Sequence, residues 1–211
     1  MEIFWLGHAA FKIKTENGKI IYLDPYQLGG NEEKADIVVA SHSHFDHFSK
    51  GDIEKVMKDN TLVLGPESIS RNLKKFNGKG LKMGEIFEVD DIKIELVPSY
   101  TIKKPTHPKS NEWTGTIIEY GGKTVYHLAD TGRIPEMKDL AKRNITVALV
   151  PCGGTYTMDF EESTDATVDI KPEIAVPCHN WDKDLTEFKN LLAKKDPNIK
   201  VEILENQTLK I

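Results

Sequence analysis

Cysteine is scarce in this 211-residue chain, and features typical of membrane and secreted proteins are missing. The two cysteines, Cys152 and Cys178, cannot form the disulfide framework that holds small secreted domains together. No apolar stretch approaches the ~20 residues that a membrane-spanning helix requires, and no secretory signal pattern is present. We therefore expect a cytoplasmic protein with no membrane partner.

Clustered positive charge is also missing. The chain carries 28 Lys and Arg against 33 Asp and Glu, which gives a formal net charge of −5. Because nucleic-acid backbones are bound through grouped Lys and Arg side chains, this balance argues against a nucleic-acid partner. The lysines are dispersed, apart from a local group formed by Lys103, Lys104 and Lys109.

No tract rich in Ser, Gly or Pro interrupts the sequence as a linker would. The 39% apolar content of 211 residues is enough for one sizeable core. We therefore predict a single domain over residues 1–211 and leave the oligomeric state open.

The hydrophobic pattern places strands first and βα units after them in each half of the chain. Runs such as Ile37-Val38-Val39-Ala40 are apolar on both faces, as expected for strands covered from both sides. Period-two alternation and turn residues predict hairpins at 2–24, 86–96, 117–126 and 200–211, with residues 2–14 and 19–24 as the arms of the first. Helical spacing predicts helices at about 53–57, 66–77, 135–142, 160–170 and 185–195. The sequence thus predicts sheets whose outer faces are covered by helices.

One short segment concentrates metal-binding side chains. In SHSHFDHF, residues 41–48, three histidines and one aspartate occupy six consecutive positions, namely His42, His44, Asp46 and His47. Imidazole nitrogens suit zinc and similar divalent ions, and carboxylate oxygens can bridge two of them. Four such donors beside a buried strand would otherwise leave lone pairs and charge uncompensated near the core. The motif therefore predicts a metal site.

Two further donors occupy the same position relative to a strand as this motif does. Asp130 follows the predicted strand 124–128, and His179 follows the predicted strand 174–176. The carboxyl ends of strands are where open α/β sheets bind ligands. We therefore expect these donors to meet at one edge of the molecule.

The predicted ligands divide between two ions. In an extended segment His42 and His44 project to the same side and can hold one ion together. Asp46 and His47 follow where the chain turns, so they can face a second ion. Asp130 is expected to bridge the two ions, and His179 is expected to complete the ligand set.

These residues together resemble the metallo-β-lactamase superfamily. The motif His42-x-His44-x-Asp46-His47, Asp130 in a Tyr-His-x-x-Asp-Thr setting and the strand-terminal His179 are similar to its motifs. The chain is most similar to the small single-domain metal-dependent hydrolases of the L-ascorbate-6-phosphate lactonase-like group. That likeness extends to Trp5-Leu6-Gly7-His8-Ala9, Asp24-Pro25 and residues 153–158. The resemblance implies a four-layer αββα sandwich of the α/β (α+β) class.

Two positions depart from the pattern of that superfamily. Its members usually carry glycine immediately before the bridging aspartate, where this chain has Ala129, a change expected to shift the backbone little. A histidine ligand of the first ion usually follows the strand that here ends at Val97-Pro98, but Ser99 and Tyr100 stand there. We expect His107, in the next loop, to reach back to the first ion. Its alternative is an ordinary place on a surface loop.

The resemblance implies a hydrolase that uses a metal-bound hydroxide on a small ester, lactone or phosphodiester. Two zinc ions are expected, with Mn²⁺ or Fe²⁺ as alternatives, because zinc lowers the pKa of bound water from ~15.7 to about 7. Asp46 is expected to contribute to catalysis as well as to metal binding. His8 and His127, together with Tyr156, are candidates for proton transfer or for orienting the ligands, although a lone histidine is as often an ordinary surface or core residue. The lysine group around Lys104 makes an anionic small-molecule substrate a further expectation.

Two other classes of function stay open at this point. An iron-dependent redox enzyme can be built on the same fold, and metal analysis of natively purified protein would distinguish it. A non-catalytic metal-binding protein would hold its ion tightly with no open coordination position. The hydrolase interpretation ranks ahead of both.

Overall fold

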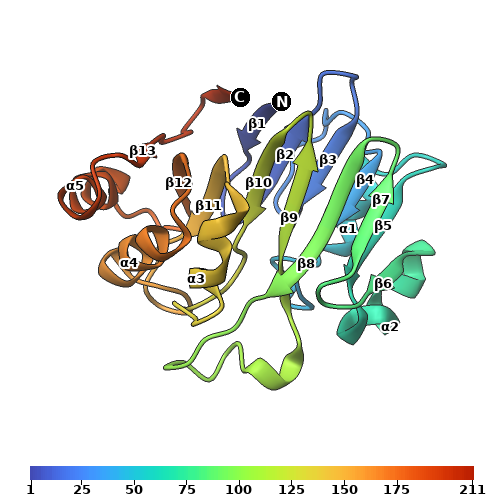
Figure 1. Ribbon diagram of the computed structural model, residues 1–211. Helices are drawn as coiled ribbons and strands as arrows, with labels where there is room; N and C mark the ends of the chain where they lie inside the picture. The colour runs from blue at the N-terminus through green and yellow to red at the C-terminus, as the bar shows by residue number, and fades with distance from the viewer.

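The computed structural model describes residues 1–211 and contains two seven-stranded mixed sheets (Figure 1). The first sheet has the order β14-β1-β2-β3-β4-β5-β6. Its strands are β1 (Glu2–Trp5), β2 (Phe11–Lys14), β3 (Ile20–Leu23), β4 (Ile37–Val39), β5 (Leu62–Pro66), β6 (Lys79–Leu81) and β14 (Thr208–Lys210). The second sheet has the order β13-β12-β11-β10-β9-β8-β7. Its strands are β7 (Ile86–Val89), β8 (Ile92–Pro98), β9 (Thr114–Tyr120), β10 (Lys123–His127), β11 (Val147–Pro151), β12 (Ile174–Cys178) and β13 (Lys200–Val201).

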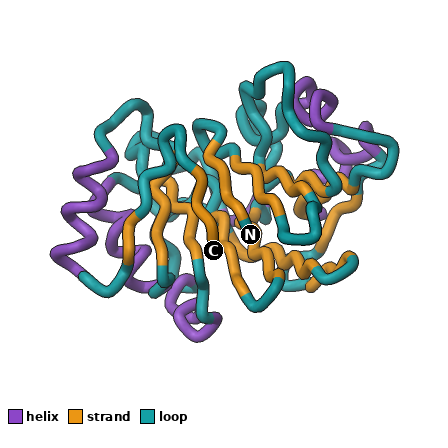
Figure 2. Tube along the Cα trace, turned by 90° about the horizontal axis from the view of Figure 1, so that it is seen from above, coloured by secondary structure: helices purple, strands orange, loops and turns teal.

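Helices cover the outer face of each sheet, so the molecule has four layers (Figure 2). The first sheet is covered by α1 (Lys50–Val56) and α2 (Ser70–Leu73), and the second by α3 (Met137–Leu140), α4 (Phe160–Ile170) and α5 (Leu185–Lys195). Single 3-10 turns flank α2, at Glu67–Ile69 and Lys74–Phe76, and follow α3, at Ala141–Arg143. A fourth, at Lys109–Asn111, lies in the loop between β8 and β9. The predicted αββα sandwich of the α/β class is confirmed.

Strands that are apolar on both faces hold the layers together. In β4, Ile37 and Val39 enter the core between the two sheets, whereas Val38 packs toward the helices of the first sheet. In β11, Leu149 enters the same central core and Ala148 packs toward the helices of the second sheet. Because side chains alternate with period two, each central strand contributes to two hydrophobic cores at once.

Strand direction brings several loops to one edge of the molecule. The parallel strands β3 and β4 end at the same edge of their sheet, and β1 runs in the same direction as β3 because β2 is antiparallel to both. In the second sheet β8, β10 and β12 likewise share one direction. The loop between β8 and β9 projects beyond this edge at the bottom of Figure 1. The loops that follow all six strands therefore have the opportunity to meet.

Three predictions about individual elements are wrong. Residues 2–14 are not one arm of a hairpin, because β1 and β2 pair with each other and a turn at residues 6–10 separates them. Residues 200–211 do not form a closing hairpin either. β13 pairs with β12 in the second sheet, while β14 pairs with β1 in the first. The predicted helix at 66–77 contains only one short α-helical segment, α2, between two 3-10 turns.

The two chain ends are joined by main-chain hydrogen bonds between Met1 and Ile211. The local residue pattern indicates strands at both ends of the chain. It cannot indicate that these strands pair, because the paired residues lie at opposite ends of the sequence. None of the helices combines the length and the apolar character that crossing a bilayer requires.

Truncation of one central side chain tests the packing between the two sheets. Leu149 is fully buried in the core that the sheets share. We expect Leu149→Ala to lower the free energy of unfolding by about 2–5 kcal/mol, because it leaves a cavity between two rigid sheets. Urea denaturation measures the change. The matched control is Ile86→Ala at an exposed position of β7, with an expected loss below about 1 kcal/mol. Equal losses in the two variants would contradict this description of the core.

Candidate metal centre

Six histidines from four loops form two groups at the edge where the strands end. The first group contains His42, His44 and His107, and the second contains His8, His47 and His179; within each group the candidate ligand atoms all lie within 4.8 Å of one another. The two groups are adjacent, since the ring centroids of His42 and His47 are 4.0 Å apart. The sequence predicted this meeting point for all of them except His8, which was a candidate for proton transfer.

Asp130 lies between the two groups. Its Oδ1 is 3.3 Å from Nε2 of His47 and 3.3 Å from Nε2 of His179, in the second group. Its Oδ2 is 3.3 Å from Nε2 of His107, in the first group. A carboxylate that turns one oxygen to each group has the orientation that a bridge between two ions requires. His107 thus reaches the first group, as expected, from the long loop between β8 and β9.

The buried polar atoms of this region lack partners within the protein. Of the eleven buried side-chain nitrogen and oxygen atoms with no hydrogen-bond partner, eight belong to His8, His47, His107, Asp130 and His179. Unpaired buried polar atoms cost free energy, so native proteins keep few of them. Because these unpaired atoms lie close together, they indicate a binding site for a species that accepts lone pairs of electrons, such as a metal ion. Imidazole and carboxylate donors are suited to divalent ions, so the residues present fit such ions.

Asp24 orients ligands of both groups. The residue follows β3, is 1% exposed, and accepts a hydrogen bond from Nδ1 of His47 at 2.6 Å through its Oδ2. Its carboxylate also accepts hydrogen bonds from the backbone N–H and hydroxyl of Ser41. The Ser41 oxygen in turn lies 2.9 Å from Nδ1 of His42. These contacts engage Nδ1 of each histidine and turn its Nε2 toward the other donors, Asp130 for His47 and His44 for His42, which is the arrangement that orienting partners provide in metal sites. Sequence reasoning had assigned Asp24 no role.

The turn between β1 and β2 fixes the position of His8. The carbonyl of His8 accepts hydrogen bonds from Nε1 of Trp5 at 2.9 Å and from the backbone N–H of His179 at 3.0 Å. Nε2 of His127 donates to the carbonyl of Ala9 at 3.0 Å. His127 itself is buried beneath the turn and packs against Phe11. The structure therefore does not bring His127 to the metal-binding edge. In place of the predicted proton transfer, His127 supports the turn that carries His8.

Asp46 lies on the outer side of the second group. One carboxylate oxygen is 3.4 Å from Nε2 of His8, and the side chain is 20% exposed. The side chain of His8 is 15% exposed. Asp46 and His8 therefore border both the buried donors and the solvent.

Backbone strain is concentrated in these loops. Residues with positive φ include His8 at 51°, Asp24 at 44°, Ala129 at 55° and His179 at 49°. L-residues adopt this left-handed region at a cost of roughly 1–2 kcal/mol each, and such strain gathers at functional sites. Ala129 thus occupies a conformation that favours glycine. The expectation that alanine would matter little at this position overlooked that conformation.

The lysine group does not present three free charges to the site. Nζ of Lys104 donates to the backbone carbonyls of Gly154 and Thr157, which ties the His107 loop to the loop after β11. Nζ of Lys109 pairs with Glu136 at 2.8 Å. Only Lys103 is exposed without such a partner. These lysines therefore give little support to an anionic substrate.

Comparison with known proteins agrees with this geometry. Residues 2–179 match the beta-lactamase superfamily domain model. A UPF0173 protein of Pyrococcus furiosus is 34% identical over 205 residues, covering 92% of each chain. A UPF0173 metal-dependent hydrolase of Pelotomaculum thermopropionicum is 32% identical over 212 residues, covering 90% of this chain and 91% of the relative.

The chain belongs to the UPF0173 family of metal-dependent hydrolases, within the beta-lactamase superfamily. Among solved structures, the family member resembles Igni18, a metallo hydrolase from Ignicoccus hospitalis. The TM-score is 0.82 at 27% identity, over 100% of this chain and 98% of Igni18. It also shares its fold, at 15% identity and a TM-score of 0.79, with CmlA, a diiron β-hydroxylase of Streptomyces venezuelae. This chain covers only 54% of CmlA, and the likeness shows the fold alone.

Burial and charge act in opposite directions on the central ionisable groups of this UPF0173 family member. Burial alone would lower the pKa of His47, but the carboxylates of Asp130 and Asp24 raise it well above its usual value. Burial would raise the pKa of Asp130, but His47 and His179 hold it well below the usual range. Burial lowers the pKa values of His42 and His44, so both are neutral at pH 7.

Proton release on metal binding tests these pKa directions. Metal ligation needs a neutral imidazole, and His47 carries a proton at pH 7 when no ion is bound, because its pKa is raised. We expect zinc binding to chelator-treated protein to release about one proton from His47 and to weaken as the pH falls. Calorimetric titration in two buffers with different heats of ionisation gives the number of protons. A binding heat independent of the buffer would contradict the raised pKa.

Proposed function

We propose that the protein is a hydrolase of small molecules that binds two divalent ions, with zinc as the first candidate and Mn²⁺ or Fe²⁺ as alternatives. Its proposed substrates are small esters, lactones or phosphodiesters. The observation that carries the proposal is the orientation of Asp130, whose two oxygens face two separate histidine groups at 3.3 Å. Two-ion sites in hydrolases share a bridging carboxylate in this way.

Each ion has a proposed set of ligands. His42, His44, His107 and Asp130 would hold the first ion. Asp46, His47, His179 and Asp130 would hold the second. When bound, such ions lower the pKa of a coordinated water and stabilise negative charge that develops on the substrate.

The exposure of the outer donors favours catalysis over a purely structural site. Structural zinc sites are closed by four protein ligands, whereas catalytic sites keep an open position. Here the buried donors are Asp130, His47 and His179, while His44, Asp46 and His8 are only partly buried. The donor set is therefore buried on its inner side and partly exposed on its outer side, where a substrate would approach.

His8 is the proposed proton-transfer residue. Burial, together with the nearby His179 and His47, lowers the pKa of His8 to about 4, so the ring is neutral at neutral pH and would pass a proton on rather than hold it. Asp46 stands 3.4 Å from Nε2 of His8, where its carboxylate would stabilise the imidazolium that results. The strained turn held by Trp5 and His127 keeps the ring in place. His127 acts in this proposal as a positioning residue only.

Removal of the bridging carboxylate tests the ligand assignment. Asp130→Ala should lower turnover more than about 100-fold and release bound metal, because even the outer partners of metal ligands contribute 10- to 100-fold to affinity or activity. Metal content by elemental analysis and turnover of a phosphodiester and lactone panel measure the two effects. Unchanged metal content in the variant would refute the bridge. The control is Glu136→Gln, which alters a partly exposed carboxylate paired with Lys109 and should change neither.

Replacement of His8 separates proton transfer from metal binding. His8→Ala should keep both ions, since His8 is not among the proposed ligands, while kcat falls by about 10²- to 10⁴-fold. His127→Ala, which loosens the turn below, should lower kcat less. Loss of an ion from the His8→Ala protein would instead make His8 a ligand and contradict the role assigned to it.

A further inference from the structure

Large apolar side chains that remain exposed gather around the metal centre. Phe45 is 75% exposed, Trp181 48% and Tyr156 45%. The loops of Phe45 and Trp181 carry site residues, and Tyr156 contacts Trp181. Phe45 stands between His44 and Asp46 in the motif. Exposed aromatic rings grouped together on a soluble protein usually mark a binding surface.

These rings form a continuous series along the side of the second histidine group. The ring of Phe45 lies 5.9 Å from that of Tyr26, and Tyr26 lies 5.4 Å from His8. Trp181 lies 5.9 Å from His8 on the other side, and Tyr156 lies 6.1 Å from Trp181. We call Phe45, Tyr26, Trp181 and Tyr156 the aromatic wall. Its rings contact one another mostly edge to face, so ring faces are left for another flat group.

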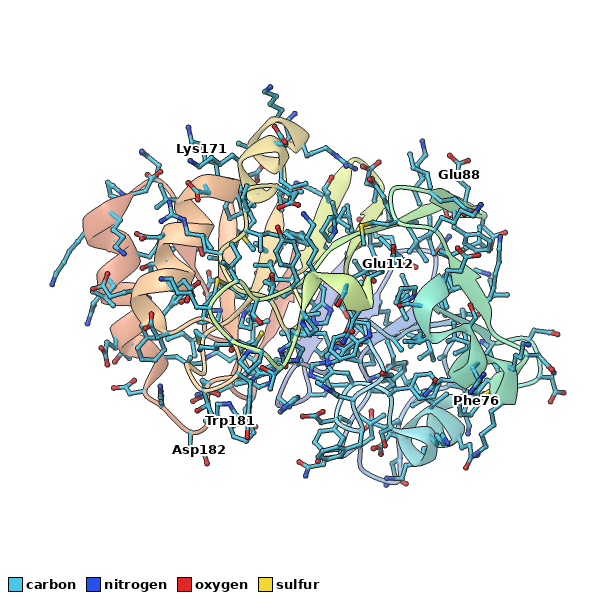
Figure 3. The ribbon with its side chains drawn as sticks, turned by 90° about the horizontal axis from the view of Figure 1, so that it is seen from below. Phe76, Glu88, Glu112, Lys171, Trp181 and Asp182 are labelled. Atoms are coloured by element: carbon cyan, nitrogen blue, oxygen red, sulfur yellow. The ribbon has the colours of Figure 1, made fainter.

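Trp181 is held in place by features that a solvated tryptophan does not need. Its backbone and that of Asp182 have positive φ, 50° and 58°. A side chain at Gly153 would place its Cβ 2.3 Å from a carbon of the Trp181 ring, so only glycine lets the ring lie against that loop. Figure 3 looks onto this face of the molecule, where Trp181 and Asp182 are labelled on the loop after β12. Strain and close packing thus fix a half-exposed aromatic ring, 5.4 Å from His179.

We propose that the aromatic wall binds a flat apolar group, such as an aryl ring, attached next to the bond that is hydrolysed, and that Trp181 is its main contact. The proposal rests on the metal-dependent hydrolase function above and narrows its substrate class. A group bound at the second histidine group has Trp181 within reach, because the indole ring lies 5.4 Å from His179 and 6.1 Å from the solvent-exposed Tyr156. Stacking on an indole ring favours flat, weakly hydrated groups over small polar ones.

Two phosphonates with the same head group test the wall. Phenylphosphonate and methylphosphonate both offer oxygen atoms to the metal ions, but only the first carries an aryl ring. Calorimetric titration of the zinc-loaded protein should give a Kd at least about tenfold lower for phenylphosphonate. In Trp181→Ala this preference should shrink to within about twofold, and in Trp181→Phe most of it should survive because a flat ring remains. Zinc content, measured in each variant, should be unchanged.

The controls separate this inference from the function on which it rests. Ile86→Ala removes a similarly exposed apolar side chain from β7, which carries no residue of the aromatic wall. This variant should keep the wild-type preference for phenylphosphonate. Equal affinity of the wild type for the two phosphonates, or an unchanged preference in Trp181→Ala, would overturn the wall alone. Binding of neither phosphonate by zinc-loaded protein would overturn the hydrolase site itself, and the wall with it.

Discussion

The site depends on the buried carboxylate of Asp130. Asp130 is 5% exposed at the point where the strands of both sheets end, and its carboxylate remains ionised because His47 and His179 outweigh the effect of burial. An isolated carboxylate in such surroundings would be costly, so the fold must supply positive charge around it. Imidazoles supply part of that charge, and divalent cations on both sides of the carboxylate would complete it. Under the proposed function, the burial of Asp130 and the binding of divalent cations answer the same requirement.

The fold meets this requirement by keeping the loops rigid. Ligands come from loops, but each loop begins at the end of a strand whose side chains enter two hydrophobic cores. Asp24 links His47 and, through Ser41, His42 to the first sheet, while Lys104 ties the His107 loop to the loop after β11. Left-handed backbone at His8 and His179 is maintained because the surrounding packing leaves no relaxed alternative. The strained backbone at these residues lowers the stability of the fold but holds the candidate ligands in a fixed geometry.

The sequence predicted the features that depend on a local pattern of residues, and it failed for those that depend on contacts between distant parts of the chain. Residues 37–40 read correctly as a doubly covered strand, and the spacing of His42, His44, Asp46 and His47 placed the site at a strand end. The turn at residues 6–10 was missed, because alternation continues through it and only the pairing of β1 with β2 defines it. The pairing of β14 with β1 joins residues some 200 positions apart, which no local pattern encodes. The family-like Asp24-Pro25 pair gave Asp24 no specific role, since a lone aspartate after a strand usually reads as a turn residue. His127 was a candidate, but its place beneath the turn depends on a contact with Ala9 that lies far away in the sequence.

The family assignment favours the hydrolase over the redox and binding-protein alternatives, so the number and position of the ions is the central question. Anomalous X-ray scattering from crystals of the protein grown with zinc or manganese answers it most directly. The account predicts two peaks about 3.5–4 Å apart, one on each side of the Asp130 carboxylate. A single peak enclosed by four protein ligands, or no peak within coordination distance of Asp130, would contradict it.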